Sequence, residues 1–140
     1  MYQKYYVAPG TYENWRLAFT KGNIWGLPEW HRPAWESLES GDIVFFYVES
    51  PLSRVVGYGQ IQDTFVDRGP FFADDYGEVT LWPLRFRFQI VLPSTDPLAS
   101  RGVSVTDMFK FPRLKRFEEL ESRQGEKLLR RCGTEMTPDQ

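Results

Sequence analysis

The chain has one cysteine, one histidine and no long hydrophobic run, and each shortage excludes a class of protein. A single cysteine, Cys132, cannot form an internal disulfide or a cysteine-based metal cluster. It is compatible with a reducing compartment, so we expect a cytoplasmic protein. No apolar segment approaches the roughly 20 residues that a bilayer-spanning helix needs, and the first residues do not form a signal peptide. We therefore expect no membrane partner.

Motifs for catalysis and metal binding are also scarce. The sequence around His31 shows no pattern typical of a nucleophilic triad, and we expect this histidine in a surface loop. One histidine and one cysteine cannot supply the usual ligands of zinc. Asp67, Asp74 and Asp75 offer oxygen ligands for Mg²⁺, but loop acids are mostly solvated. P-loop and dinucleotide-binding glycine motifs are absent as well. We therefore expect no metal, no cofactor and no enzymatic activity.

An overall positive charge is lacking too. The formal net charge is −2 and the estimated pI is 5.5, which argues against a protein that coats nucleic acid with its whole surface. Local basic groups can still neutralise the phosphates around one or a few nucleotides. Two groups qualify, a pair on one strand face and a run of four within seven residues: Arg85 and Arg87, then Lys110, Arg113, Lys115 and Arg116. The alternative for both groups is an ordinary solvated surface.

Aromatic residues, by contrast, are abundant. Eleven Phe, seven Tyr and five Trp make up 16% of the 140 residues, and they must fill a core or line a site. The chain is long enough for one hydrophobic core. We expect a single domain over residues 1–133 and a flexible tail over 134–140.

The hydrophobic pattern predicts an α+β fold, with strands in the middle of the chain and helices towards both ends. Strands are predicted over 4–8, 43–49, 54–64 and 80–92. Helices are predicted over 12–20, 34–38, 105–109, 118–122 and 126–132, the last of them ended by Gly133. The segments 23–32 and 65–79 are predicted to be irregular. In the second, Phe71 and Phe72 either form a lid or wedge or pack over a satellite core.

Trp25 lies in the most informative segment, between Ile24 and Gly26 and shortly before Pro28. We interpret this segment as a turn, which presents an indole to a ligand better than it buries one. Aromatic faces stack on nucleobases at about 1–3 kcal/mol per base. Trp82 can complete a sandwich with Trp25, and the alternative is that both are core residues. Of the other tryptophans, Trp15 and Trp35 are expected to pack inside the protein, and Trp30 can close the pocket.

The run from Tyr5 to Ile61 resembles the EVE domain, a branch of the PUA-like superfamily related to the YTH domain. The resemblance rests on a Tyr-Tyr-Val strand followed by Glu13-Asn14-Trp15, on Asn23-Ile24-Trp25-Gly26-Leu27-Pro28, and on Gly41-Asp42 before Ile43 to Val48, with Val56-Gly57-Tyr58-Gly59 after it. Leu81-Trp82-Pro83-Leu84-Arg85-Phe86 is similar to the long strand of that family. The resemblance covers most of residues 4–92 and is loose in the C-terminal third.

This resemblance implies a small, closed PUA-like β-barrel of about five to six strands flanked by helices, whose pocket takes a flipped or single-stranded base. Relatives read methylated or hydroxymethylated bases in DNA or methyladenine in RNA, some within restriction systems. Trp25 matches the first aromatic wall, Trp82 lies near the expected second wall, and Asn14 matches a position that hydrogen-bonds the base edge in YTH domains. Pro9-Gly10 stands where YTH domains have a polar pair, so methyladenine specificity does not simply carry over.

We therefore expect non-catalytic binding of a methylated or hydroxymethylated nucleobase in DNA or RNA, by base flipping, alongside a restriction or RNA-processing partner. The expected base-binding residues are Trp25, Trp82, Asn14, Gly26, Leu27, Pro9, Gly10 and Trp30. This hypothesis predicts that Trp25→Ala abolishes binding and leaves the fold intact. Two alternatives stay open: an enzyme acting on a nucleotide or modified base, and a module that binds a protein or small ligand.

Overall fold

The computed structural model describes residues 3–72, 75, 80–108 and 116–136. Strands and helices alternate in the first third of the chain: β1 (Tyr5–Gly10), α1 (Tyr12–Thr20), β2 (Ile24–Leu27), the 3-10 turn η1 (Glu29–His31) and α2 (Arg32–Glu36). Three strands and a 3-10 turn follow, then a last strand and helix: β3 (Ile43–Val48), β4 (Arg54–Val66), β5 (Leu84–Leu92), η2 (Pro97–Ala99), β6 (Glu118–Leu120) and α3 (Ser122–Glu135). The predicted α+β class is confirmed.

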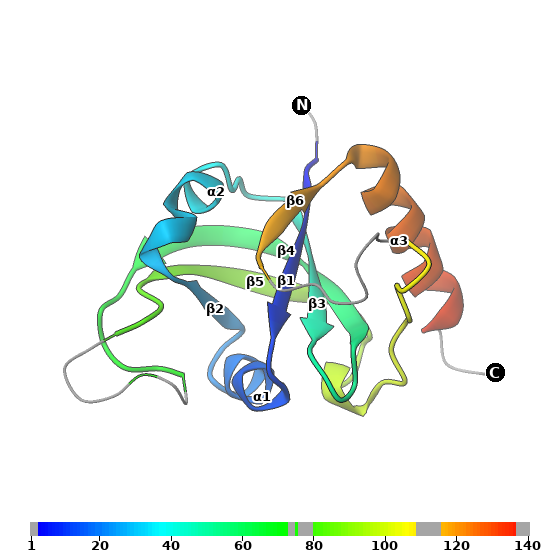
Figure 1. Cartoon of the computed structure of the whole chain (residues 1–140), viewed down its shortest axis with the longest axis horizontal. Helices are drawn as coiled ribbons and strands as arrows, with labels where there is room; N and C mark the ends of the chain where they lie inside the picture. Colours follow the sequence, from blue (N-terminus) through cyan, green and yellow to red (C-terminus); the bar gives the residue numbers. More distant parts are fainter. Residues whose placement is uncertain (1–2, 73–74, 76–79, 109–115, 137–140) are drawn as a thin grey trace.

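The six strands form one curled sheet in the order β2-β5-β4-β3-β1-β6 (Figure 1). β1 and β3 pair in parallel, so the chain between them has to cross over, and it does so through α1, β2 and α2. The other neighbouring strands pair antiparallel. Within the described residues β2 and β6 are the two edges of the sheet. The sheet is therefore a half-barrel, not the closed barrel that the resemblance implies.

Side chains that alternate along β1 and β3 fill two cores on opposite faces of the sheet. Tyr6 and Phe46 belong to the core that includes Trp15 of α1. Tyr5 and Phe45 belong to the other core, together with Leu128 and further apolar residues of α3. Because both faces of β3 are covered, all six of its residues are buried, as its unbroken apolar sequence predicts.

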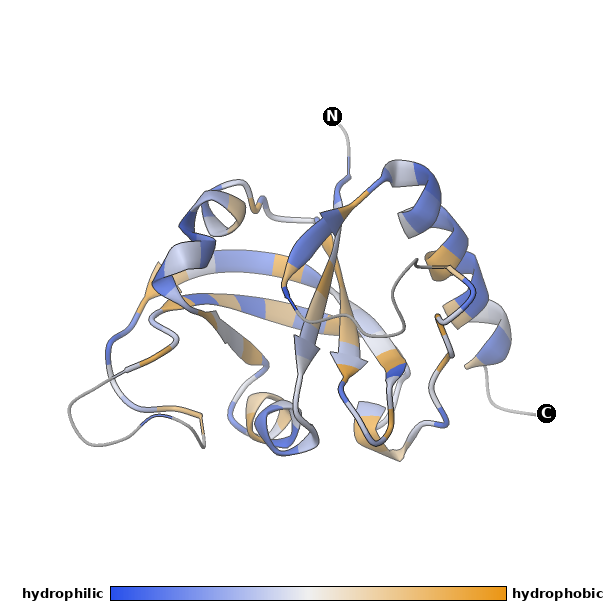
Figure 2. Cartoon of the chain, viewed as in Figure 1, coloured by the Kyte–Doolittle hydropathy of each residue, from blue (hydrophilic) through white to orange (hydrophobic). Residues whose placement is uncertain are grey.

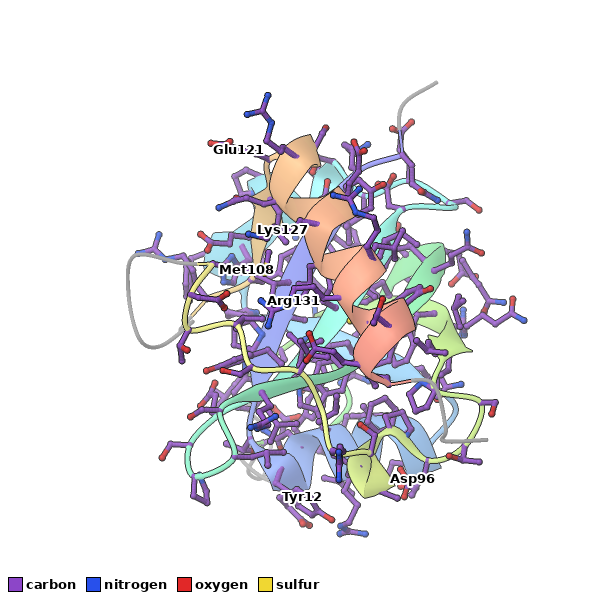
Figure 3. The ribbon with its side chains drawn as sticks, turned by 90° about the vertical axis from the view of Figure 1, so that its right-hand side faces the viewer. Tyr12, Asp96, Met108, Glu121, Lys127 and Arg131 are labelled. Carbon is purple, nitrogen blue, oxygen red and sulfur yellow. The ribbon has the colours of Figure 1, made fainter. Side chains whose placement is uncertain are left out.

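Helix α3 covers the second core with a narrow apolar stripe, and most of its residues are hydrophilic (Figure 2). It approaches β1 closely at Gly125, where a Cβ atom would overlap the ring of Tyr5. Arg131 of α3 donates to Asp107 across 3.0 Å, beside Met108 (Figure 3). No helix of the described residues has the length and apolarity to cross a bilayer.

Four segments differ from the sequence-based prediction. Residues 24–27 are strand β2, because they gain backbone pairing with β5. Residues 118–120 are strand β6 and not a helix, since pairing with the free edge of β1 overrides the helix propensity of Glu and Leu. α3 continues through Gly133, because a glycine inside a helix costs only about 1 kcal/mol. Residues 105–108 form a turn, closed by Met108 donating to the Val105 carbonyl.

Candidate functional site

A cavity of about 250 Å³ lies where the end of β1, the start of α1, β2 and η1 meet. Its lining includes all eight residues that the sequence predicts at a base: Pro9, Gly10, Asn14, Trp25, Gly26, Leu27, Trp30 and Trp82. The other lining residues are Thr11, Pro28, His31, Glu49, Phe72, Arg116 and Phe117. We call this cavity the Trp25 pocket. The structure thus brings the predicted residues together, and their contact with a base stays a prediction.

Trp25 is a wall of the pocket but not an exposed turn residue. It lies on β2 and its side chain is 5% exposed. Its ring stacks on the buried indole of Trp15, with 3.8 Å between ring centroids and 12° between planes. Trp15 is held in place because its Nε1 donates to the Tyr47 carbonyl at 3.0 Å. Stacking on Trp15 therefore occupies one face of Trp25, and a ligand can contact only the part of the ring that lines the pocket.

Two glycines leave the space that the aromatic walls fill. A Cβ atom at Gly10 would overlap the ring of Trp25. At Gly26 it would lie 2.8 Å from Phe72 Cε2 and 2.9 Å from the Trp82 carbonyl oxygen, closer than van der Waals contact allows. The pocket therefore depends on glycine at both positions.

Phe72 joins the two predicted walls. Its ring meets Trp25 edge-on at 5.2 Å and Trp82 edge-on at 5.6 Å. Because Phe72 is buried in the main core, it is a fixed wall of the pocket and not a lid or wedge. Its loop is held by the Asp75 carboxylate, which accepts the backbone N–H groups of Phe71, Phe72 and Leu81.

Of the three acids considered for Mg²⁺, the two that the structure describes have other partners. Asp75 serves the backbone, Asp67 pairs with Arg85 at 3.3 Å, and Asp74 lies outside the described residues. No group of three potential metal ligands occurs among the residues that the structure describes.

Polar or charged side chains of the pocket lining are Thr11, Asn14, His31, Glu49 and Arg116. The sequence analysis gave a site role to Asn14 and Arg116 and missed the other three. The prediction of a surface loop for His31 is wrong: it is 8% exposed and stacks on the exposed indole of Trp30 with 3.8 Å between centroids. Burial, together with the charge of Arg116, lowers the pKa of His31, so its ring is neutral at pH 7. Burial raises the pKa of the Glu49 carboxyl. The sequence analysis did not place Glu49 at the site, because its position beside Gly10 follows from the parallel β1–β3 pairing and no local pattern reveals that pairing.

The predicted phosphate contacts divide into four cases. Arg85 is 3% exposed, pairs with Asp67 and donates to the carbonyls of Gly69 and Trp82, so it is an internal residue and not a phosphate contact. Arg87 is exposed and pairs with Asp63 at 3.1 Å. Arg116 is exposed and lines the pocket. The remaining three predicted contacts fall outside the described residues: Lys110, Arg113 and Lys115.

The protein is similar to known proteins in its structure. Neither a family profile nor a curated protein matches the sequence. The YTH domain-containing protein mmi1 in complex with RNA is similar with a TM-score of 0.67 at 15% identity, over 93% of this chain and 81% of that one. The Pho92 YTH domain in complex with m6A is similar with a TM-score of 0.59 at 16% identity, over 98% of this chain and 85% of that one. Protein Atu2648 from Agrobacterium tumefaciens is similar with a TM-score of 0.59 at 16% identity, over 97% of this chain and 99% of that one. At such low identity these likenesses establish the fold alone, and that fold is YTH-like.

Proposed function

We propose that the Trp25 pocket binds one modified nucleobase of a nucleic acid strand and releases it unchanged. The observation that carries this proposal is the convergence of Trp25, Trp82 and Asn14, from three separate segments, on one cavity. Stacking on an aromatic side chain contributes about 1–3 kcal/mol per base. A methyl group removed from water adds about 0.8 kcal/mol, which favours a methylated base over a plain one.

The size of the pocket favours a single planar ring. Its volume of about 250 Å³ lies just below the roughly 300–1,000 Å³ typical of small-molecule sites. A run of stacked nucleotides does not fit such a cavity, so the base must be flipped out of a duplex or come from a single strand. Asn14 can then meet the base edge, because its amide offers both a donor and an acceptor.

The structural neighbours favour RNA as the first partner to test. Complexes of the mmi1 and Pho92 YTH domains contain RNA and m6A, respectively. DNA remains a second partner to test, because the sequence resembles EVE domains. The EVE-type assignment, with a restriction or RNA-processing partner in the cytoplasm, is part of this proposal and rests on that sequence resemblance.

Arg116 is the basic residue best placed to hold a flanking phosphate, since it is exposed and lines the pocket. Each phosphate contact releases counterions, so binding weakens as salt rises. Arg116→Ala is therefore expected to weaken binding to all sequences alike and to reduce the salt dependence.

The test is a fluorescence anisotropy titration with single-stranded RNA and DNA oligonucleotides that differ only in one modified base. Trp82→Ala removes a half-buried wall, and we expect a roughly 5- to 150-fold loss of affinity for the modified strand. Leu81→Ala is the matched control, because Leu81 is exposed, adjacent in sequence and absent from the lining. Binding that ignores the modification, or that is equal in wild type and Trp82→Ala, would refute the proposal.

A further inference from the structure

We propose that Glu49 determines which bases the Trp25 pocket accepts: it selects bases with an exocyclic amino group, as in cytosine and adenine, over keto bases such as thymine and uracil. This inference rests on the function proposed above and specifies its class of ligand.

Glu49 is fixed at the wall of the pocket by its backbone. It follows the last residue of β3, and its N–H donates to the Gly10 carbonyl at 2.9 Å. Gly10 in turn lies against the ring of Trp25. The parallel pairing of β1 and β3 thus places Glu49 at the end of the sheet where Trp25 and Asn14 line the same cavity.

The Glu49 side chain is half-buried and has no ion pair or side-chain hydrogen bond with any residue that the structure describes. Burial alone raises the pKa of its carboxyl, since water is lost and no cation compensates. A partly buried acceptor of this kind gains most from a ligand that brings its own donor. The amino groups of cytosine and adenine are such donors, whereas the O4 atom of thymine or uracil would face the carboxylate oxygens and be repelled.

The other polar side chains of the pocket lining either donate only or can both donate and accept. The Asn14 amide and the neutral His31 ring each offer a donor and an acceptor, and either suits an amino or a keto edge. Arg116 is a donor only and is exposed. Among the described lining residues, Glu49 is the charged acceptor, so the discrimination falls to it.

Three pairs of bases test the amino group, whose replacement also adds a proton on N3 in the two pyrimidine pairs and a second methyl group in the purine pair. 5-methylcytosine and thymine differ at position 4, as do 5-hydroxymethylcytosine and 5-hydroxymethyluracil, while N6-methyladenine keeps one N–H that N6,N6-dimethyladenine lacks. Each base is placed in the same single-stranded oligonucleotide and titrated by anisotropy. We expect wild type to bind the amino member at least about tenfold more tightly in one or more pairs.

Three variants assign this preference. Glu49→Gln adds a donor to the same shape, and we expect the preference to fall to about threefold or less while binding persists. Glu49→Asp keeps the acceptor and is expected to keep the direction of the preference. Glu36→Gln is the control, because Glu36 is exposed on α2 and lies outside the pocket lining.

The outcomes separate this inference from the proposed function. Modification-dependent binding with equal affinity for both members of every pair, or an undiminished preference in Glu49→Gln, would overturn the role of Glu49 alone. A wild-type protein that binds none of the six strands would overturn the proposed function, and the role of Glu49 with it.

Discussion

Trp25→Ala tests both the packing and the proposed role of the central indole. A Trp25 presented on a turn, as the sequence predicts, would leave the fold intact when truncated. In the structure Trp25 is 5% exposed and stacks on Trp15 at 3.8 Å. Truncation of a core Trp to Ala costs about 3–5 kcal/mol, against a total stability of about 5–15 kcal/mol for a typical domain. We therefore expect a folded but strongly destabilised variant, and a less affected Trp25→Phe.

The assay combines urea unfolding, followed by circular dichroism, with titration of the modified oligonucleotide at low temperature. The unfolding curve gives the folded fraction, so that loss of binding can be corrected for unfolding. After this correction we expect a further 5- to 150-fold loss of affinity, from about 1–3 kcal/mol of stacking. Trp25→Phe retains an aromatic face and is expected to lose less of both quantities.

The predicted loss of stability and the predicted loss of affinity can each be contradicted separately. A Trp25→Ala variant within about 0.5 kcal/mol of wild type would behave like a surface substitution and would contradict the stacked, buried position. A corrected affinity equal to that of wild type would show that the ligand does not contact Trp25.

Three further predictions concern stability and reactivity. Asp42→Ala should lower the free energy of unfolding, measured in urea, by about 2–4 kcal/mol. The buried Asp42 carboxylate accepts the backbone N–H groups of Lys4 and Glu39 and pairs with the Lys4 ammonium. Cys132, whose pKa burial raises to about 12, should resist iodoacetamide at pH 8 in the native protein and react in denaturant, as read by mass spectrometry. Glu49→Gln should raise the melting temperature at pH 7, because it removes a desolvated carboxylate. This gain should vanish as the pH falls through the raised pKa of Glu49 towards about pH 4, where the wild-type carboxyl is protonated in both the folded and the unfolded state.

Each of these has a contrary result. An unchanged urea midpoint for Asp42→Ala would mean that the carboxylate is not a structural acceptor. Alkylation of native Cys132 at the rate of a free thiol would contradict its burial. A Glu49→Gln variant that is less stable at pH 7, or equally stabilised at both pH values, would show that the wild-type carboxylate is not destabilised by burial.

Periodicity predicted the long elements well and the short ones poorly. The apolar run 43–49 and the alternation after Leu84 correspond to β3 and β5, because side-chain burial on a sheet imposes those patterns. β2 and β6 are only four and three residues long, and each exists because the edge of a neighbouring strand supplies its backbone partners. A local pattern carries no information about such a partner.

The site shows the same division. Resemblance and residue chemistry placed Trp25, Trp82 and Asn14 at one pocket, and the structure brings them together there. Residue chemistry could not reveal that Arg85 pairs with Asp67 and donates to backbone carbonyls, since these contacts depend on how the loop after β4 folds back. Glu49 likewise reaches the pocket only through the β1–β3 pairing.

The most direct test of the account is a nuclear magnetic resonance titration that follows the five indole N–H signals as a modified oligonucleotide is added. Trp25 and Trp82 line the pocket, and their signals should shift in proportion to the bound fraction. Trp35 lies outside the lining and donates its Nε1–H to the Arg85 carbonyl at 2.9 Å, so its signal should stay in place. Saturable binding that leaves the Trp25 and Trp82 signals unmoved would contradict a base-binding pocket at Trp25.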